Sequence, residues 1–451
     1  VTLSESNKTI ILQNLFFEQD AEELAFPTIY LGRRRGIEST HAKIYKYMSS
    51  ELRRYDRRGV IPEHLLYMAM KMMRCRMKDV LAAMPKEIRE NKSSSLSEKT
   101  INITMEAFRN ICRYLPDSPW YWSEQRHDIF ALIRQFGRPS FMLTFHANEI
   151  GCNRLLKLLY DLQNNGAKIS EHDVALLDHM KKVNLINQDA VCCALYFKKL
   201  VSVLLNICQL GISPFKPYHL EQYFRRITFN ENGSPCVHIF LWLAETPKEP
   251  LGSNRTSTII IINQLIRVSK KDSSGHINLQ THQHNVNCYD KNKSLSCEVG
   301  APFMPSRWTL ILPPLPETDD DFPMASAHYA QIKKNLETED YCNIREFFQK
   351  NNVHSDTQYL KILQAGIKHP HIFLEREPSE RWIIPFNPFF LNVTQGLVDI
   401  RFILDEYTCA RYIMDYLCKS KRTISDLQRQ VLDIMNKHKE FNLAEVLEKM
   451  S

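Results

Sequence analysis

Two tyrosines late in the sequence, Tyr412 and Tyr416, have the type and spacing of paired nucleophiles. In a helix, residues four apart lie on one face, so both phenols would reach the same place. Lys419, Lys421 and Arg422 follow, and cations at this end of the helix would attract a phosphate. A phenol is a weak nucleophile at its ordinary pKa of about 10, so a neighbouring metal or base would have to activate it. Two tyrosines that only pack on a half-buried helix give the same pattern, so both interpretations stay open.

A second candidate site is the pair Cys236 and His238. If this stretch is a strand, both side chains point to one face, while Val237 and Ile239 point to the other face and enter the core. One imidazole and one thiolate could then share a cation. A partly buried strand with an incidental histidine is the competing interpretation, and the spacing alone favours it.

A third candidate is a run of zinc-type ligands, His282, His284, Cys288 and Cys297, spaced H-x-H-x3-C-x8-C. The surrounding residues are poor in apolar side chains, and a metal can order a segment that buries no core. We favour a structural zinc over coincidence. His276 is an alternative ligand, although a surface position explains it as well.

Composition excludes several classes of protein. The 451 residues are 44% hydrophobic and 24% charged, so wholesale disorder is excluded, and the net charge of +7 is compatible with a local basic surface. The 13 glycines form no G-x-x-x-x-G-K-[ST] loop and no G-x-G-x-x-G loop, so we expect no ATP-driven helicase motor in this chain. The G-x-S-x-G and H-E-x-x-H hydrolase motifs are also missing.

The sequence favours a soluble, intracellular protein with no membrane partner. It shows no basic stretch followed by an apolar signal core and no window of 18 uninterrupted apolar residues. The 12 scattered cysteines fit reduced thiols better than a disulfide scaffold. Because the chain begins with Val1, we suspect a fragment or a misassigned start.

Hydrophobic periodicity predicts an α+β protein in four regions. Residues 1–130 should form a helical, basic region, and 131–245 should hold strands. Residues 246–323 should be an insertion with the zinc ligands and a Pro-rich acidic linker, and 324–451 should contain a helical segment, further strands and the two-tyrosine helix. The expected strands are 141–145, 223–229, 237–243, 382–384 and 397–403, with a hairpin turn at 230–234. The expected helices include 62–73, 149–162, 190–210, 324–350, 356–367 and 406–419.

Blocks of residues resemble, in order, the Helitron rolling-circle transposases. Gly137–Glu149 (GRPSFMLTFHANE) resembles the first block, in which Gly-x-Pro leads into a strand and an Ala-Asn-Glu. The later blocks are Asp189–Phe197, Ser213–Phe215, Tyr223–Leu243, Pro385–Pro388, Val398–Phe402 and Tyr412–Lys419. The resemblance covers most of residues 25–425.

The resemblance implies a Rep-like nuclease domain, an antiparallel sheet flanked by helices. It would carry a His-hydrophobic-His motif for Mg²⁺ or Mn²⁺ on a central strand and two tyrosines on a helix. In such enzymes a tyrosine attacks a phosphodiester of single-stranded DNA and becomes linked to the 5′-phosphate. By position, Tyr412 and Tyr416 inherit the nucleophile roles, His238 inherits one metal ligand, and Lys419 inherits a phosphate contact. A His-rich, Cys-containing loop also occurs in the family where this chain has His282 to Cys297.

Two positions depart from the family pattern. Cys236 stands where the family has the first histidine of its metal pair, and Thr228 stands where a glutamate is usual. A thiolate suits softer ions such as zinc, so Cys236 should weaken or alter the site, although His146 could substitute in space. We therefore predict metal-dependent DNA nicking and strand transfer in the nucleus, with a catalytically inactive DNA-binding copy as the alternative. In the wider family the nuclease precedes a helicase, so any unwinding would need sequence outside Val1–Ser451.

Overall fold

The computed structural model describes residues 20–33, 41–82, 119–210, 213–230, 233–247, 251, 255–272, 275–284, 288, 297, 299–405, 409, 412 and 413. The chain divides into two compact units. The first comprises Val1–Asp128, Cys152–Tyr196 and Cys418–Ser451, and the second comprises Ile129–Gly151 and Phe197–Leu417.

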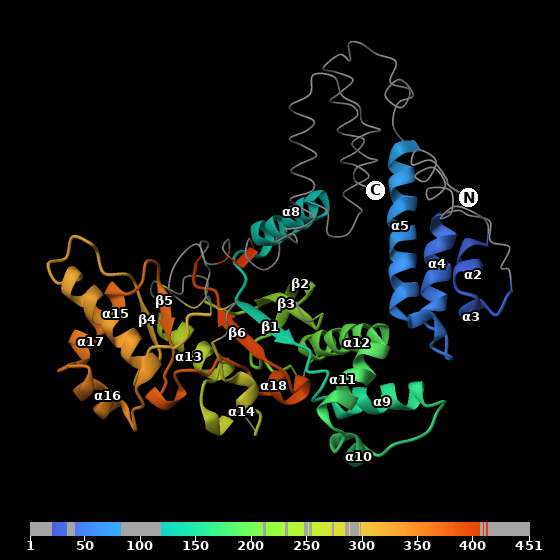
Figure 1. The fold of residues 1–451 in the computed structure, drawn as a ribbon. Helices are drawn as coiled ribbons and strands as arrows, with labels where there is room; N and C mark the ends of the chain where they lie inside the picture. Colours follow the sequence, from blue (N-terminus) through green and yellow to red (C-terminus); the bar gives the residue numbers. More distant parts are fainter. Residues whose placement is uncertain are drawn as a thin grey trace, which may run out of the picture. The chain divides into compact units, whose positions relative to one another are not determined.

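The described part of the first unit is helical (Figure 1). Side-chain caps begin two of its helices: Ser170 accepts a hydrogen bond from the Asp173 amide, and Asp178 accepts one from the Lys181 amide. Its elements are α2 (Ala21–Ala25), α3 (Pro27–Tyr30), α4 (His41–Glu51), η1 (Arg58–Val60), α5 (Pro62–Ala82), α9 (Asn153–Gln163), α10 (Glu171–Ala175), α11 (His179–Gln188) and the first parts of α8 (Pro119–Phe136) and α12 (Ala190–Gln209).

An ion pair ties the N-terminal segment of this unit to the start of α12. The Arg57 guanidinium donates through Nε and one terminal nitrogen to both carboxylate oxygens of Asp189, each at 2.6 Å. Asp189 is 1% exposed and also accepts a hydrogen bond from the Cys192 amide at 2.8 Å. Asp189 therefore anchors Arg57 and satisfies a backbone donor in the first turn of α12.

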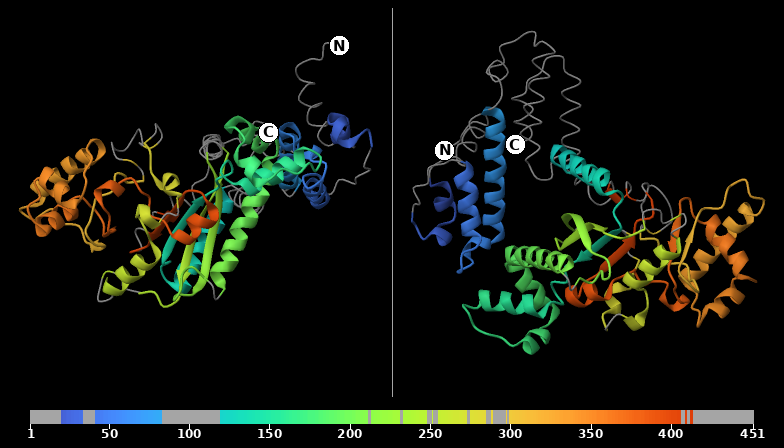
Figure 2. Two further views of the ribbon diagram at one scale, coloured as in Figure 1. Left: turned by 90° about the horizontal axis from the view of Figure 1, so that it is seen from below. Right: turned by 180° about the vertical axis from the view of Figure 1, so that it is seen from behind.

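The second unit is built on a four-stranded antiparallel sheet with strand order β2-β3-β1-β6. The strands are β1 (Phe141–His146), β2 (Leu220–Phe229), β3 (Pro235–Leu243) and β6 (Val398–Phe402). β2 and β3 form the predicted hairpin, in which the Gly233 amide donates to Asn230 O and Gly233 adopts a φ of 81°. β6 comes from far along the chain and pairs with β1, so it occupies the second edge (Figure 2).

One face of the sheet forms the main hydrophobic core. Alternate residues of β1, β3 and β6 point to it, and helices cover it. The second part of α12, α13 (Arg255–Leu265) and α18 (Pro388–Thr394) supply this cover. The buried side chains include Phe141, Leu143, Phe145, Val237, Ile239, Leu241, Val398, Ile400 and Phe402 from the sheet, and Val201, Ile262 and Phe390 from the helices.

A smaller core in the same unit is formed by α15 (Phe322–Thr338), α16 (Ile344–Lys350), α17 (Asp356–Ala365) and the two-stranded sheet of β4 (Leu310–Leu312) and β5 (His371–Phe373). Phe347 and Leu363 are fully buried in it. The remaining short elements are η2 (Lys270–Asp272), α14 (Ile277–Gln280) and η3 (Pro378–Glu380).

The α+β class is confirmed, and so are the strands on either side of the hairpin. The single helix predicted over 324–350 is wrong, because one helix, α15, ends at Thr338 and a second helix, α16, begins at Ile344. Asn343 begins α16 there by accepting hydrogen bonds from the Arg345 and Glu346 amides, each at 3.0 Å. Residues 382–384 are not a strand but make one isolated bridge, between Ile383 and Thr281. The predicted helix 406–419 falls mostly outside the described residues, although Tyr412 is helical.

α12 is the one helix among the described residues that is long and apolar enough to cross a membrane by length and composition. Its second part buries Phe197, Val201 and Leu204 in the main core, and its first part packs Cys192 and Cys193 against α9. Core packing therefore accounts for these apolar residues of α12.

Candidate functional site

The face of the sheet opposite the main core carries polar side chains in rows. Residues directly opposite each other in an antiparallel sheet point to the same face. One row holds Thr228, Cys236 and His146. The next holds Arg226, His238, Thr144 and Asp399, and the row after it contains Arg401. The fold therefore gathers imidazole, thiol, hydroxyl, carboxylate and guanidinium groups on one face.

Three of these side chains touch one another around His238. The Thr228 hydroxyl lies 3.2 Å from His238 Nε2 and 3.1 Å from the Cys236 sulfur, and the sulfur lies 3.3 Å from the same Nε2. On the other side of the ring, Thr144 Oγ1 lies 3.0 Å from His238 Nδ1. If Nδ1 carries the proton and donates it to Thr144, the Nε2 lone pair faces Cys236 and Thr228.

Burial keeps this triplet neutral. Cys236 is 2% exposed and His238 is 8% exposed. Burial lowers the pKa of His238 to about 4, and the positive charges of His146 and Arg226 act in the same direction. Burial raises the pKa of Cys236, against the hydrogen bond from Thr228 and the charge of Arg226. At neutral pH the imidazole is therefore in the form that binds metals, whereas the thiol is not.

His146 lies opposite Cys236 in the register, on the same face of the sheet. Asn230 Nδ2 lies 3.3 Å from His146 Nδ1. Burial lowers the pKa of His146, and the nearby carboxylate of Asp399 acts against this. The structure thus brings the histidine considered as a substitute ligand to the same surface as His238.

Asp399 and Arg401 were not singled out as site residues from the sequence. They alternate with buried residues along β6 and share a face, so Arg401 pairs with Asp399 at 2.9 Å. The polar-apolar alternation of Val398–Phe402 was the available signal for their direction. It could not show that β6 lies beside β1.

The donors around His238 do not fit Mg²⁺ or Mn²⁺. Those ions prefer several oxygen ligands, and the atoms that meet here are one imidazole nitrogen, one buried thiol and one hydroxyl. Among the described residues, no group of three His, Cys, Asp or Glu donors forms on this face.

Such a three-donor group does form at the predicted zinc ligands. Ligand atoms of His282, Cys288 and Cys297 all lie within 4.8 Å of one another, with His282 Nε2 at 3.7 Å from the Cys288 sulfur and 3.2 Å from the Cys297 sulfur. Burial lowers the pKa of His282, and the charge of His284 adds to the effect. One imidazole and two thiols are ligands typical of zinc.

His284, the fourth predicted ligand, is a neighbour of this group rather than a member of it. Its ring centroid lies 5.2 Å from that of His282 and 5.1 Å from that of Trp382, edge to face in both cases. The His282 amide donates to Trp382 O at 2.8 Å. This backbone hydrogen bond holds His282 beside residues 382–384, which the sequence had predicted as a strand.

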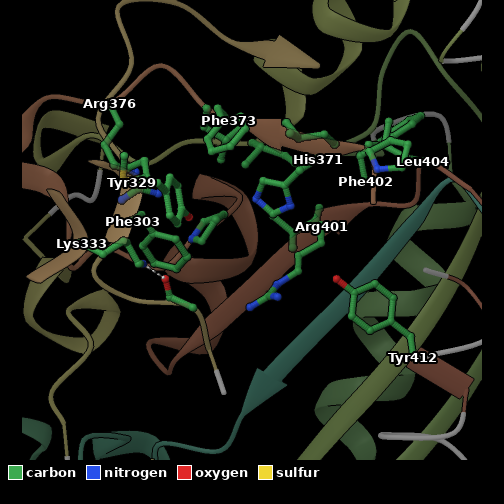
Figure 3. Close-up of a pocket in the computed structure, with 18 residues that line it drawn as sticks. Phe303, Tyr329, Lys333, His371, Phe373, Arg376, Arg401, Phe402, Leu404 and Tyr412 are labelled. Atoms are coloured by element: carbon green, nitrogen blue, oxygen red, sulfur yellow. Dashed lines mark hydrogen bonds between the residues drawn. The ribbon is translucent and has the colours of Figure 1, made fainter. Parts of the chain in front are cut away.

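Tyr412 lines a pocket of about 170 Å³ beside β6, together with Lys333, His371 and Arg401 (Figure 3). In this view the phenol oxygen is directed toward the Arg401 side chain. The other residues predicted for this helix and its end, Tyr416, Lys419, Lys421 and Arg422, lie outside the described residues.

Comparison with protein families finds a match over part of the chain. Residues 60–241 match the model described as the Helitron helicase-like domain at the N-terminus. The match contains β1, β2 and most of β3, with Thr144, Thr228, Cys236 and His238. Searches of curated proteins and of solved structures gave no match. The resemblance seen in the sequence is therefore confirmed for this part of the chain: residues 60–241 belong to the Helitron helicase-like N-terminal domain family.

Proposed function

We propose that this chain acts on single-stranded DNA in Helitron-type rolling-circle transposition, and that Tyr412 and Tyr416 nick and transfer one strand. The observation that carries the proposal is the shared pocket of Tyr412 and Arg401. Arg401 extends from the sheet face that also carries His238 and Asp399. A phenol and a guanidinium beside one cavity can supply a nucleophile and a phosphate contact.

In this chemistry a tyrosine oxygen forms a bond to phosphorus, and the bond between phosphorus and the 3′-oxygen breaks. The phenol loses its proton and the departing 3′-oxygen gains one, so a 3′-hydroxyl and a 5′-phosphotyrosine link result. Arg401 would stabilise the negative charge that develops on the phosphoryl oxygens. Asp399, which pairs with Arg401, would hold the guanidinium in place.

The test is covalent capture of DNA. The purified chain is incubated with an oligonucleotide labelled at its 3′ end, in the presence of Mg²⁺, Mn²⁺ or Zn²⁺ in turn, and a labelled band at the protein's mass is sought on a denaturing gel. We expect an adduct that disappears in a Tyr412→Phe, Tyr416→Phe double variant. Absence of an adduct with every ion would overturn the proposal of nicking.

A second candidate function is DNA binding without nicking. It is favoured by the contact of Thr228, Cys236 and His238, because this donor set does not fit the hard ions on which the family chemistry depends. Both candidates predict single-strand binding that weakens steeply with salt, since lysine and arginine replace counterions on the phosphates. Only the first predicts the adduct.

Two further parts of the proposal concern a metal and a partner. We propose that His282, Cys288 and Cys297 hold a structural zinc, supported by their mutual distances and ligand types. We also propose that a helicase outside this sequence separates the strands, because no phosphate-binding loop occurs between Val1 and Ser451.

A further inference from the structure

The pocket beside β6 has a lining that the proposed nicking reaction does not by itself explain. β6 is an edge strand, and the pocket lies at this edge between the main sheet and the segments around α15 and β5 (Figure 3). All of its lining residues belong to the second unit.

The lining is cationic. It contains Lys333, Arg376 and Arg401, and none of the described lining residues is acidic. Lys333 Nζ donates to Gly300 O at 2.9 Å and also to Pro302 O. Since an ammonium has three donors, two carbonyl contacts leave a third for a ligand. Such a lining favours an anion and disfavours a cationic ligand.

The lining is also aromatic. Phe303, Tyr329, Phe373, Phe402 and Tyr412 contribute rings. The Arg376 guanidinium lies 4.5 Å from the centre of the Phe303 ring, a cation–π contact. Rings beside cations are the combination with which proteins hold single-stranded nucleic acids, because every base has a face that can stack on a ring.

The size of the pocket limits what can enter. Sites for drug-sized ligands occupy roughly 300–1,000 Å³, and this pocket has about 170 Å³. A single planar ring system with an attached phosphate is the kind of group that suits both the volume and the lining. A duplex does not present such a group, since its bases are stacked inside the helix.

We propose that this pocket binds one unstacked nucleotide of single-stranded DNA, with its base among Phe303 and Tyr329 and its phosphate at Lys333 and Arg401. The nucleotide would lie next to the phosphodiester that Tyr412 attacks and would set which linkage reaches the phenol. This inference rests on the proposed function and adds a subsite to it. In Figure 3, Lys333 lies on the Phe303 side of the pocket, and His371 and Arg401 lie between that side and Tyr412.

The first experiment leaves the protein unchanged. Single-stranded oligonucleotides that each lack one base at a different position are bound to the full 451-residue chain, and affinity is measured by fluorescence anisotropy. We expect one position at which loss of the base weakens binding by about tenfold, the effect of losing one stacked base. A uniform response at all positions would overturn the proposal.

The second experiment compares two neighbouring lysines of α15. Lys333 lines the pocket, whereas Lys334 is exposed and does not. Both substitutions, Lys333→Gln and Lys334→Gln, remove one positive charge. We expect Lys333→Gln to weaken binding about tenfold more than Lys334→Gln and to abolish the position dependence of the missing base. Equal effects of the two substitutions would contradict the subsite.

Two controls separate this inference from its alternatives. Thymidine monophosphate at millimolar concentration should compete weakly with the oligonucleotide; if it binds in a Lys333-dependent way while the oligonucleotide does not, the pocket serves free nucleotides and the inference is wrong. A missing-base response without a covalent adduct supports the subsite while nicking fails. An adduct without that response supports nicking while the subsite fails.

Discussion

Thr144 on β1 and His238 on β3 lie directly opposite each other, and 3.0 Å separates Thr144 Oγ1 from His238 Nδ1. This contact fixes the imidazole so that Nε2 meets Thr228 and Cys236. A histidine held in this way is oriented as metal ligands usually are, with one nitrogen bonded to the protein and the other presented to the site. The residues it meets, rather than the histidine, would decide which ion could bind beside it.

Restoring the family ligands should restore activity. We expect the double variant Cys236→His, Thr228→Glu to increase the yield of covalent adduct with Mn²⁺ by at least about tenfold, because it supplies a second imidazole and a carboxylate beside His238. The assay is the denaturing gel described above. Cys236→Ser is the control, since it removes the thiol without adding a ligand. Equal yields from the double variant and Cys236→Ser would contradict this account of the site.

The chain should lose stability on acidification. Burial lowers the pKa of His238 from 6.5 to about 4, so between these values the unfolded state binds more protons than the folded state. The free energy of unfolding therefore falls as pH falls through this window, by about 2 kcal/mol between pH 7 and pH 5 from this group. Urea denaturation at both pH values, with a chelator present, measures the difference.

Substitution can assign this pH effect. His238→Gln should reduce the difference in stability between pH 7 and pH 5, whereas His172→Gln should leave it unchanged because the His172 side chain is 82% exposed. Burial lowers the pKa values of His146 and His282 as well, so part of the pH dependence will remain in the His238 variant. An unchanged dependence in His238→Gln would show that its proton uptake does not oppose folding.

The His/Cys group should retain zinc through purification. We expect about one zinc per chain by elemental analysis, and we expect removal by a chelator to lower the Tm by at least about 5 °C, because the metal links segments that bury little apolar surface. Cys297→Ser should lose the metal and show the same lower Tm. Cys342→Ser should keep it, since Cys342 is exposed and lies outside the group. A metal-free chain with unchanged Tm would contradict the prediction.

Loss of the buried ion pair should destabilise the first unit strongly. Arg57→Ala leaves the buried carboxylate of Asp189 without its guanidinium, so we expect a loss of about 3 kcal/mol in the free energy of unfolding. Arg58→Ala is the matched control: Arg58 is 44% exposed, its nearest carboxylate oxygen, on Asp56, lies at 3.5 Å, and the expected change is below about 1 kcal/mol. Urea denaturation followed by circular dichroism distinguishes the two. Similar losses from both substitutions would show that the pair contributes little.

Local sequence patterns predicted the hairpin well. Alternating side chains and the polar turn from Asn230 to Ser234 specify two neighbouring strands, because turn chemistry and strand propensity act over a few residues. The same reasoning merged α15 and α16 into one helix. It did not weigh the ability of Asn343 to cap a new helix, which begins at Ile344, after α15 has ended at Thr338.

The sequence predicted the group of zinc ligands only in part. Their residue types and spacing predicted a group, and three of the four side chains do meet. The place of His284 depends on Trp382, which is distant in sequence and packs against its ring. The spacing of the His and Cys residues along the sequence gives no information about a neighbour such as Trp382.

The sequence by itself determined the residue types, the strand alternation that puts Cys236 and His238 on one face, and the family of residues 60–241. Only the tertiary structure decided that β6 lies beside β1, which puts Asp399 in the row of His238 and Arg401 beside Tyr412. The physical reason is that strand order and register depend on contacts between residues far apart along the chain, whereas periodicity records only which side of its own strand each residue occupies.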